Sequence, residues 1–292
     1  MDLNSLFSLE GKIALITGGS RGIGKMFVEG FVAAGCERVY ITARKAQVVE
    51  ETAAEFGDKV IGLPGDISRM EGIEELAAEI GRRENRLDIL VNNAGAAWGG
   101  EFEEFPEIGW NKVMDLNVKT PFFLTQKLHG LLKAAATVER PAKVINIASI
   151  DGFRPNPWET YSYQASKAAL IHLTKRMAAR LIKDNIVVSG IAPGAFPSEM
   201  NKAARDHGGK VGESIPAGRI GVAEDMAAGA IYLASRAGDY VVGTTIPIDG
   251  GIVNAWVDND HLDPSGHCFS SSPSTCDDGG DRHAVWRGGG GI

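Results

Sequence analysis

The sequence predicts an α/β fold built on one doubly wound parallel sheet. Short apolar runs alternate with amphipathic segments over most of the chain, and this alternation is typical of βαβ units. A glycine-rich segment, residues 18–24, joins the first apolar run to the first amphipathic segment. The 292 residues, 44% hydrophobic and 23% charged, fit one large globular domain. We count seven strand-like runs and therefore expect a single-domain, Rossmann-like sheet of seven strands.

The first half of the chain supplies four of these strands, with helices between them. Strands are predicted at residues 12–17, 38–43, 60–63 and 87–92, which are rich in apolar and β-branched side chains. Helices are predicted at residues 24–34, 47–56 and 70–82, where apolar residues recur at helical spacing. Right-handed crossovers then put helices on both faces of the sheet.

The second half continues the alternation. Residues 108–136 are predicted to be helical, with an interruption near residues 119–121 because Pro121 disfavours the helical region for Thr120. Strands are predicted at 143–148, 186–191 and 244–248, and helices at 163–183 and 223–235. The polar residues 195–218 lack periodicity, so we expect an irregular, mobile segment there.

The composition changes near the C-terminal end of the sequence. We expect residues 1–256 to form the domain, with a cofactor half of about 1–148 and a catalytic and substrate half of about 149–256. Residues 257–292 are rich in Gly, Ser, Asp and Pro, which predicts a disordered or loosely attached tail. It contains His261, His267, Cys268, Cys276 and His283. These lack the paired Cys-x-x-Cys spacing of zinc sites, so we predict no metal site, with zinc as the minor alternative.

Charge and hydropathy exclude several function classes. Acidic residues outnumber basic ones by 37 to 30, a net charge of −7, which argues against a nucleic-acid partner. No apolar run approaches the length of a membrane span, and residues 1–10 do not resemble a signal peptide. Three cysteines are too few for a disulfide framework. We therefore expect a cytoplasmic protein without a membrane partner.

A glycine-rich loop follows the first predicted strand and leads into the first helix. Gly18, Gly22 and Gly24 form a Gly-x-x-x-Gly-x-Gly pattern there. Glycines allow a close approach of the backbone to a pyrophosphate, and a helix N-terminus favours negative charge. A connector without function has the same composition, but the position between strand and helix favours a dinucleotide site. We assign to it Gly18, Ser20, Arg21, Gly22, Ile23 and Gly24.

The residues after the second strand favour NADP(H) over NAD(H). NAD-binding sheets place a carboxylate about 20 residues beyond the glycines, where it accepts hydrogen bonds from the ribose. Here Arg44 and Lys45 follow the strand, so Arg44 and Arg21 are expected to pair with a 2′-phosphate. An ordinary solvated loop is the alternative. Asp66 and Ile67 are assigned to the same site, where Asp66 accepts from the adenine amino group or, alternatively, caps a turn.

Tyr163 and Lys167 form the predicted proton-transfer pair. They are four residues apart, so in a helix both side chains lie on one face. A tyrosine hydroxyl has a pKa of about 10, and a nearby ammonium stabilises the phenolate and lowers that pKa. The same spacing also occurs on solvated helices by chance. Tyr161 has Ala165 instead of lysine four residues on and is excluded as the acid.

Together these residues make the chain resemble the short-chain dehydrogenase/reductase family, from about residue 11 to residue 251. The motifs concerned are Thr17-Gly18-x-x-x-Gly22-x-Gly24, Asn92-Asn93-Ala94-Gly95, Asn117, Ser149, Tyr163-x-x-x-Lys167 and Pro193-Gly194. Within the family the chain is most similar to the 3-oxoacyl-acyl-carrier-protein reductase type, including the reductases of rhamnolipid synthesis. Residues 98–99, 144–147, 191–194, 196–198 and 246–251 carry this narrower likeness.

The resemblance implies a role for each site residue. Tyr163 is the acid that protonates the carbonyl oxygen, and Lys167 lowers its pKa and binds the nicotinamide ribose. Ser149 hydrogen-bonds the substrate oxygen, and Asn117 anchors a water that links Lys167 to solvent. A strand-closing serine and a helix-kinking asparagine are the alternatives. The resemblance also assigns cofactor contacts to Asn93, Ala94, Gly95, Pro193, Gly194, Phe196 and Ser198, the last of which meets the carboxamide.

The expected function is NADPH-dependent reduction of a ketone to a secondary alcohol, with a 3-oxoacyl thioester as the favoured substrate. One alternative is an alcohol, polyol, sugar or secondary-metabolite dehydrogenase of the same family. The other is a non-enzymatic NADP(H)-binding regulator, since fold does not determine function. The intact Ser149, Tyr163 and Lys167 argue against a regulator.

The expected partners are a small-molecule carbonyl substrate, free or linked to acyl carrier protein or CoA, and further copies of the chain. We expect pocket walls from residues 96–101, 150–158 and 196–211, with Phe153, Trp158 and Phe196 as apolar members. Lys202, Arg205 and Lys210 are candidates to dock an acidic carrier protein, or are simply a charged flexible segment. The resemblance implies a dimer or tetramer through the helices at 108–136 and 163–183.

Overall fold

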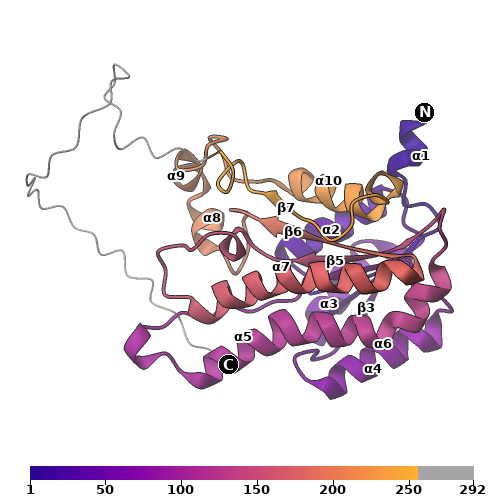
Figure 1. The fold of residues 1–292 in the computed structure, drawn as a ribbon, viewed down its shortest axis with the longest axis horizontal. Helices are drawn as coiled ribbons and strands as arrows, with labels where there is room; N and C mark the ends of the chain where they lie inside the picture. Colours follow the sequence, from indigo (N-terminus) through magenta and orange to yellow (C-terminus); the bar gives the residue numbers. More distant parts are fainter. Residues whose placement is uncertain (256–292) are drawn as a thin grey trace, which may run out of the picture.

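The computed structural model describes residues 1–255, in which seven strands form a single parallel sheet (Figure 1). The strands are β1 (Ile13–Thr17), β2 (Arg38–Ala43), β3 (Val60–Pro64), β4 (Ile89–Asn92), β5 (Ala142–Ile147), β6 (Ile186–Pro193) and β7 (Thr245–Ile248). Their order is β3-β2-β1-β4-β5-β6-β7, and every neighbouring pair is parallel. The predicted fold class is confirmed.

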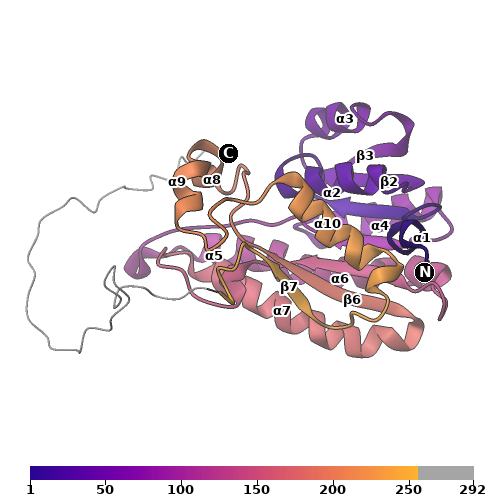
Figure 2. The same ribbon diagram turned by 90° about the horizontal axis from the view of Figure 1, so that it is seen from above.

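Helices cover both faces of the sheet (Figure 2). On one face lie α2 (Gly22–Ala33), α3 (Ala46–Ala54) and α10 (Ala223–Ala234), and on the other α4 (Met70–Arg83), α6 (Thr120–Ala135) and α7 (Tyr161–Leu181). Phe27 and Phe31 of α2 are fully buried on the first face, and Leu124 and Leu128 of α6 on the second. Each such side chain stabilises the fold by about 1.5–3 kcal/mol, so the two cores hold the layers together.

The strand order creates a crevice at the carboxyl ends of β1 and β4. β1 pairs with β2 on one side and with β4 on the other, so the loops that leave β1 and β4 diverge. Ligands of open α/β sheets bind at such a switch point. The glycine-rich loop follows β1 and residues 93–95 follow β4, so both predicted cofactor segments lie there.

The helix predicted at residues 108–136 contains a π-helical turn instead of a break. α5 (Glu107–Met114) leads into the π turn (Asp115–Lys119), and α6 begins at Thr120. The regular α-helix is thus interrupted just before the predicted place. Thr120 keeps helical angles, φ −58° and ψ −50°, directly before Pro121, so the predicted cause of the interruption is wrong. Pro121 stands in the first turn of α6, where a missing N–H is tolerated.

Two short helices occupy residues 195–218, which we predicted to be irregular. They are α8 (Lys202–Asp206) and α9 (Gly208–Glu213). The Asn201 side chain caps α8 by accepting a hydrogen bond from the Ala204 N–H at 3.1 Å, and Ala204 is buried. The prediction is wrong within residues 202–213, because helices of five or six residues are too short for a helical period to show in the sequence.

Several further short helices also escaped prediction. α1 (Leu3–Phe7) is capped by Asp2, whose side chain accepts from the Asn4 N–H at 3.0 Å. Single 3₁₀ turns occur at Gly57–Lys59, Phe102–Glu104, Ile150–Gly152, Ile182–Asp184 and Arg236–Gly238. The turn at Ile150–Gly152 matters most, because it follows Ser149 at the end of β5.

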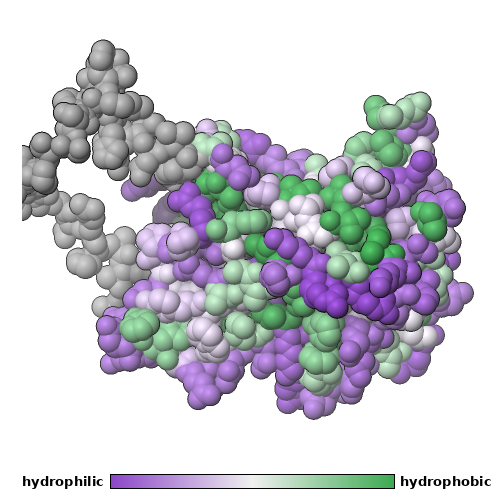
Figure 3. Space-filling model, viewed as in Figure 1, coloured by the Kyte–Doolittle hydropathy of each residue, from purple (hydrophilic) through white to green (hydrophobic). Residues whose placement is uncertain are grey.

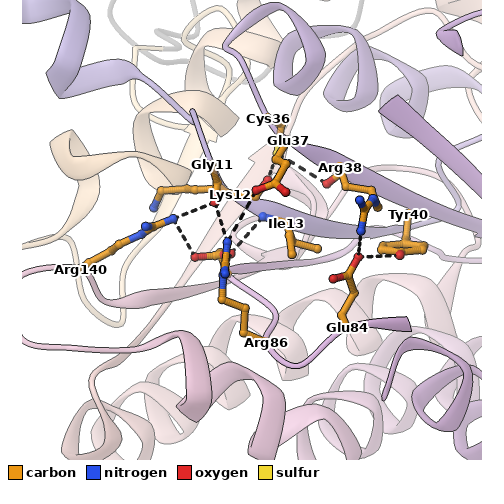
Figure 4. Close-up of polar contacts among 11 residues, drawn as sticks. Gly11, Lys12, Ile13, Cys36, Glu37, Arg38, Tyr40, Glu84, Arg86 and Arg140 are labelled. Carbon is orange, nitrogen blue, oxygen red and sulfur yellow. Dashed lines mark hydrogen bonds and ion pairs between the residues drawn. The ribbon is translucent and has the colours of Figure 1, made fainter. Parts of the chain in front are cut away.

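Buried charges tie together the amino ends of the strands, at the edge of the sheet opposite the crevice (Figure 4). Asp88 is 2% exposed and accepts hydrogen bonds from the Ile13 N–H at 3.0 Å and from the guanidinium groups of Arg86 and Arg140 at 3.3 and 3.1 Å. A buried charge without partners is costly, so these contacts hold the start of β1 against β4. Arg86 is two residues from Asp88, but Ile13 and Arg140 are far from it in sequence, so no local pattern indicates those two contacts.

The surface drawn in Figure 3 is mostly polar, with apolar residues in small patches. One patch covers α1, where Leu3 and Phe7 remain exposed. Within residues 1–255 no helix is long and apolar enough to cross a membrane, and no His, Cys, Asp or Glu cluster is arranged to hold a metal. The predicted tail, with its three histidines and with Cys268 and Cys276, lies outside the described residues.

Candidate active site

The glycine-rich loop has a conformation that depends on its glycines. Gly18 and Gly22 have φ values of +66° and +51°, in the region that favours glycine. A Cβ on Gly24 would lie 2.1 Å from the carbonyl oxygen of Gly18. The loop therefore presents bare backbone at the N-terminus of α2, an arrangement that fits the pyrophosphate of a dinucleotide.

Asn93 and Thr17 fasten this loop to the end of β4. The Asn93 side-chain amide donates to the carbonyl oxygens of Thr17 and Gly18 at 2.8 and 3.2 Å. The Thr17 hydroxyl oxygen accepts from the main-chain N–H groups of Asn93 and Ala94 at 3.0 and 2.9 Å. The two predicted cofactor segments thus lie side by side at the switch point.

Arg21 and Arg44 are both exposed, one at the start of α2 and the other after β2. Asp66, after β3, accepts hydrogen bonds from the N–H and hydroxyl of Ser68 at 3.1 and 2.8 Å. Desolvation raises the pKa of Asp66, but the Ser68 hydrogen bonds and the charge of Arg44 outweigh it, and the pKa is lowered. Arg44 and Asp66 therefore lie on the same side of the crevice, and Asp66 also caps a turn.

Two residues assigned to the cofactor have side chains that pack in the interior. Ile67 is 5% exposed, and Ile23 packs against the core beneath α2. Each can therefore offer mainly its main chain to a ligand in the crevice.

Ser149, Tyr163 and Lys167 meet where β5 ends and α7 begins. The Lys167 ammonium donates to the Ile147 carbonyl oxygen at 2.8 Å and lies 5.6 Å from the centroid of the Tyr163 ring. The Ser149 hydroxyl hydrogen-bonds Tyr163. Ser149 and Lys167 are 7% and 5% exposed and Tyr163 is partly buried, so water has little access to the three groups predicted to be catalytic.

The pKa of Tyr163 moves in the direction opposite to our expectation. Burial raises it to about 12, with the Ser149 hydrogen bond opposing and the Asp151 charge reinforcing the rise. Burial also lowers the pKa of Lys167 to about 8. The predicted lowering of the Tyr163 pKa is wrong for the protein alone, because loss of phenolate hydration is the largest influence on that pKa. Tyr163 is thus protonated at neutral pH, as a proton donor must be.

Asn117, in the π turn, connects the loop after β4 to α7. Its amide exchanges two hydrogen bonds with the main chain of Ala96, at 2.8 and 2.9 Å, and donates to the Ser166 hydroxyl at 2.9 Å. Ser166 in turn donates to the Tyr163 carbonyl oxygen at 2.7 Å. Both amide hydrogens of Asn117 are therefore engaged within this network.

The absence of a side chain at Gly95 leaves space beside this network. A Cβ there would lie 3.2 Å from the Asn117 amide oxygen and 3.7 Å from the Lys167 ammonium. On the other side of the crevice, Ser198 approaches the glycine-rich loop, 3.2 Å from where a Cβ of Gly22 would stand. Pro193 and Gly194 end β6 at the same edge, and the Gly194 N–H donates to the Ile248 carbonyl at 2.9 Å.

One predicted pocket wall is wrong. The Phe196 ring is 2% exposed and packs in the core against Gly221, where a Cβ would stand 2.2 Å from the ring. Its apolar character therefore stabilises the fold, and only its main chain is available to a ligand. Phe153 and Trp158 remain exposed in the loop between β5 and α7.

A groove of about 880 Å³ lies along the loop before α7 and the first turn of α7, and Tyr161 belongs to it. Its lining includes Phe102, Phe105, Trp110, Pro155, Pro157, Trp158, Tyr161 and Gln164. The Tyr161 hydroxyl donates to Glu159 at 2.9 Å, and its ring meets the rings of Phe102 and Phe105 edge to face at 5.6 Å. Residues two apart on a helix point to nearly opposite sides, so Tyr161 faces away from the catalytic groups.

The family follows from comparison with known proteins. Residues 12–208 match the family model described as short chain dehydrogenase, which is more than half of the chain. The chain belongs to the short-chain dehydrogenase/reductase family. It is an oxidoreductase of that family, as its motifs predicted.

Two relatives, one of them also known as a solved structure, illustrate the range of the family around this chain. The rhamnolipids biosynthesis 3-oxoacyl-[acyl-carrier-protein] reductase of Pseudomonas aeruginosa is 47% identical over 255 residues, covering 85% of this chain and 99% of the relative. The solved Pseudomonas aeruginosa RhlG/NADP active-site complex superposes with a TM-score of 0.82 at 45% identity, covering 85% and 99%. A 2-dehydro-3-deoxy-D-gluconate 5-dehydrogenase of Dickeya dadantii is 37% identical over 259 residues, covering 86% and 98%.

Sequence reasoning missed Ser166 and Asp151 as members of this dehydrogenase/reductase site. Ser166 stands inside the Tyr163-x-x-x-Lys167 motif, three residues after the tyrosine, so its position alone was a usable signal. Asp151 follows Ser149 by two residues, but no local sequence pattern indicates that the turn folds back toward α7.

Proposed function

We propose that this chain is an NADPH-dependent reductase that converts the ketone of a 3-oxoacyl thioester to a secondary alcohol. The observation that carries the proposal is the meeting of a protonated Tyr163 with Ser149 and Lys167 beside the glycine-rich loop. NADPH supplies the hydride when bound. The chain's own task is to orient the carbonyl and to deliver a proton to its oxygen.

Each catalytic group has one part in this reaction. Tyr163 gives its phenolic proton to the carbonyl oxygen while the carbonyl carbon accepts hydride. Ser149 donates a hydrogen bond to the same oxygen and stabilises the charge that develops there. Lys167 stabilises the phenolate that remains, and a proton returns from solvent through a water on the Asn117 carbonyl.

The cofactor preference rests on the charges around the crevice. Arg21 and Arg44 suit a 2′-phosphate, and no acid follows β2 to repel it. Asp66 suits the adenine amino group, and Ser198 suits the nicotinamide carboxamide. The NADP complex of the Pseudomonas aeruginosa relative supports the same preference.

We expect Gly24→Ala to weaken NADPH binding by roughly tenfold or more. The added methyl would lie 2.1 Å from the Gly18 carbonyl oxygen, so the loop must shift away from its pyrophosphate-binding conformation. Gly81→Ala in α4 is the matched control, because a Cβ there has no neighbour within 4 Å. It should keep wild-type affinity and stabilise the fold by about 0.5–1 kcal/mol. Fluorescence titration with NADPH and thermal unfolding measure both, and wild-type affinity in Gly24→Ala would contradict the loop assignment.

A substrate panel with NADPH tests the proposed substrate. Following NADPH absorbance, we expect the highest kcat/KM with a 3-oxoacyl thioester and lower values with simple ketones and keto sugar acids. The relative of 47% identity favours the thioester, and the gluconate dehydrogenase of 37% identity makes a sugar acid the second candidate. A higher kcat/KM with the sugar acid than with the thioester would make the sugar acid the proposed substrate. Tight NADPH binding without consumption of any carbonyl would favour a non-enzymatic regulator.

The proposed partners extend beyond the small molecule. We propose a dimer or tetramer through α5, α6 and α7, since Ile108, Trp110 and Phe122 stay 73%, 41% and 39% exposed on these helices. A basic dock for acyl carrier protein has weaker support than its sequence suggested, because Arg205 is paired with Asp206 and Glu199. Lys202 and Lys210 remain exposed for that role. We propose a cytoplasmic location.

A further inference from the structure

The turn after Ser149 carries a carboxylate that the proposed mechanism leaves unused. Asp151 lies in the 3₁₀ turn Ile150–Gly152, and its N–H donates to the Ser149 hydroxyl oxygen at 3.2 Å. Burial raises the pKa of its carboxyl, and hydrogen bonding with the Asn156 and Ser149 side chains opposes the rise. Gln164, directly after the catalytic tyrosine, donates to the Asn156 side chain at 3.1 Å. Asp151 is thereby connected to both elements that carry the catalytic groups, the carboxyl end of β5 and the start of α7.

The turn is also packed directly on α7, so no side chain fits between them at Gly152. A Cβ on Gly152 would lie 2.7 Å from the main-chain carbon of Lys167 and 2.7 Å from the side chain of Ile171. Burial is the larger influence on the pKa values of Tyr163 and Lys167, and the Asp151 charge favours the protonated form of each. The Asp151 carboxylate therefore acts on both members of the proton-transfer pair.

The other charged groups around this turn have partners elsewhere or stand at a distance. The Arg154 guanidinium donates to the Ile252 carbonyl at 2.9 Å, and Glu159 accepts from the Tyr161 hydroxyl. The neighbouring loops, residues 93–100 and 193–198, contain no charged residue. In β5, Lys143 lies at the amino end and pairs with Asp239 at 2.7 Å. A substrate held by Ser149 thus meets the field of Asp151 and Lys167.

Resting on the proposed function, we infer that Asp151 is a positioning and specificity-determining residue: its carboxylate opposes negative charge on the Tyr163 oxygen and on the substrate. A fixed like charge in a poorly hydrated site disfavours both. The residue would keep Tyr163 ready as a proton donor. It would also select neutral 3-oxoacyl esters and thioesters over ketones that carry a carboxylate close to the carbonyl.

Ethyl acetoacetate and acetoacetate test this, because they share a 3-oxo skeleton and differ in one negative charge. The kcat/KM of NADPH-dependent reduction is measured for both from about pH 6 to 10 with wild type, Asp151→Asn and Glu159→Gln. We expect Asp151→Asn to raise the acetoacetate-to-ester ratio about tenfold. We also expect it to lower the alkaline limb that deprotonation of Lys167 sets, near its pKa of about 8, by about one pH unit. Glu159→Gln removes the same charge eight residues on and should change neither.

The outcomes separate the inference from the function on which it rests. A ratio and an alkaline limb in Asp151→Asn equal to those of wild type would overturn the inference while leaving the reductase intact. Wild type that reduces neither compound nor a longer 3-oxoacyl thioester would overturn both. Asp151→Glu keeps the charge and should keep the wild-type alkaline limb, and Asp151→Ser serves as a second neutral variant if Asp151→Asn folds poorly.

Discussion

Replacing Tyr163 with phenylalanine is expected to lower kcat for ketone reduction by about 10³-fold, within the range of a positioned general acid. The substitution removes the one phenolic proton that the site can deliver to the carbonyl oxygen. The ring is retained, so its packing and its 5.6 Å approach to the Lys167 ammonium should persist. Steady-state kinetics measure the loss, and NADPH titration should give an affinity within about twofold of wild type.

Tyr161→Phe is the matched control, with the same atom removed two residues earlier on the same helix. It loses a hydrogen bond to the exposed Glu159 and keeps its edge-to-face contacts with Phe102 and Phe105. We expect its kcat to stay near wild type. If Tyr163→Phe turned over at the wild-type rate, or if Tyr161→Phe were the inactive variant, the assignment of the acid would be wrong.

Arg44→Asp is expected to lower the preference for NADPH over NADH by about 30-fold, which corresponds to the loss of one charge-assisted hydrogen bond. The arginine is exposed after β2, on the same side of the crevice as Asp66. Its replacement removes the partner of the 2′-phosphate and adds a carboxylate that repels phosphate and can accept from ribose hydroxyls. The ratio of kcat/KM values for the two cofactors, measured with one ketone, reports the change.

Lys59→Asp makes the same charge change at the other end of the neighbouring strand. Lys59 is exposed in the turn before β3, at the amino edge of the sheet, and should not contact the cofactor. We expect its cofactor ratio to match wild type. Arg44 would not be the partner of the 2′-phosphate if Arg44→Asp kept the wild-type ratio. The same would follow if both variants changed the ratio equally, as a general effect of net charge would require.

The fold and the cofactor crevice could be predicted because they depend on local patterns. Strand and helix periods, a glycine loop between β1 and α2, and an arginine after β2 are all readable within a few residues. The exceptions have local reasons. α8 and α9 are too short to show a period, and Pro121 stands where a helix tolerates it, so the π turn was mistaken for a break.

The sequence by itself determined the family, the seven-strand parallel sheet, and the identity of the residues proposed for catalysis and cofactor binding. The tertiary structure alone decided the protonation of these residues, their burial and their neighbours in space. Burial raised the pKa of Tyr163 although a lysine stands one helical turn away. The Phe196 side chain is buried in the core. The turn after β5 places Asp151 near the proton-transfer pair. Hydration and electrostatic fields depend on everything that surrounds a group in space, and spacing along the chain does not encode that surrounding.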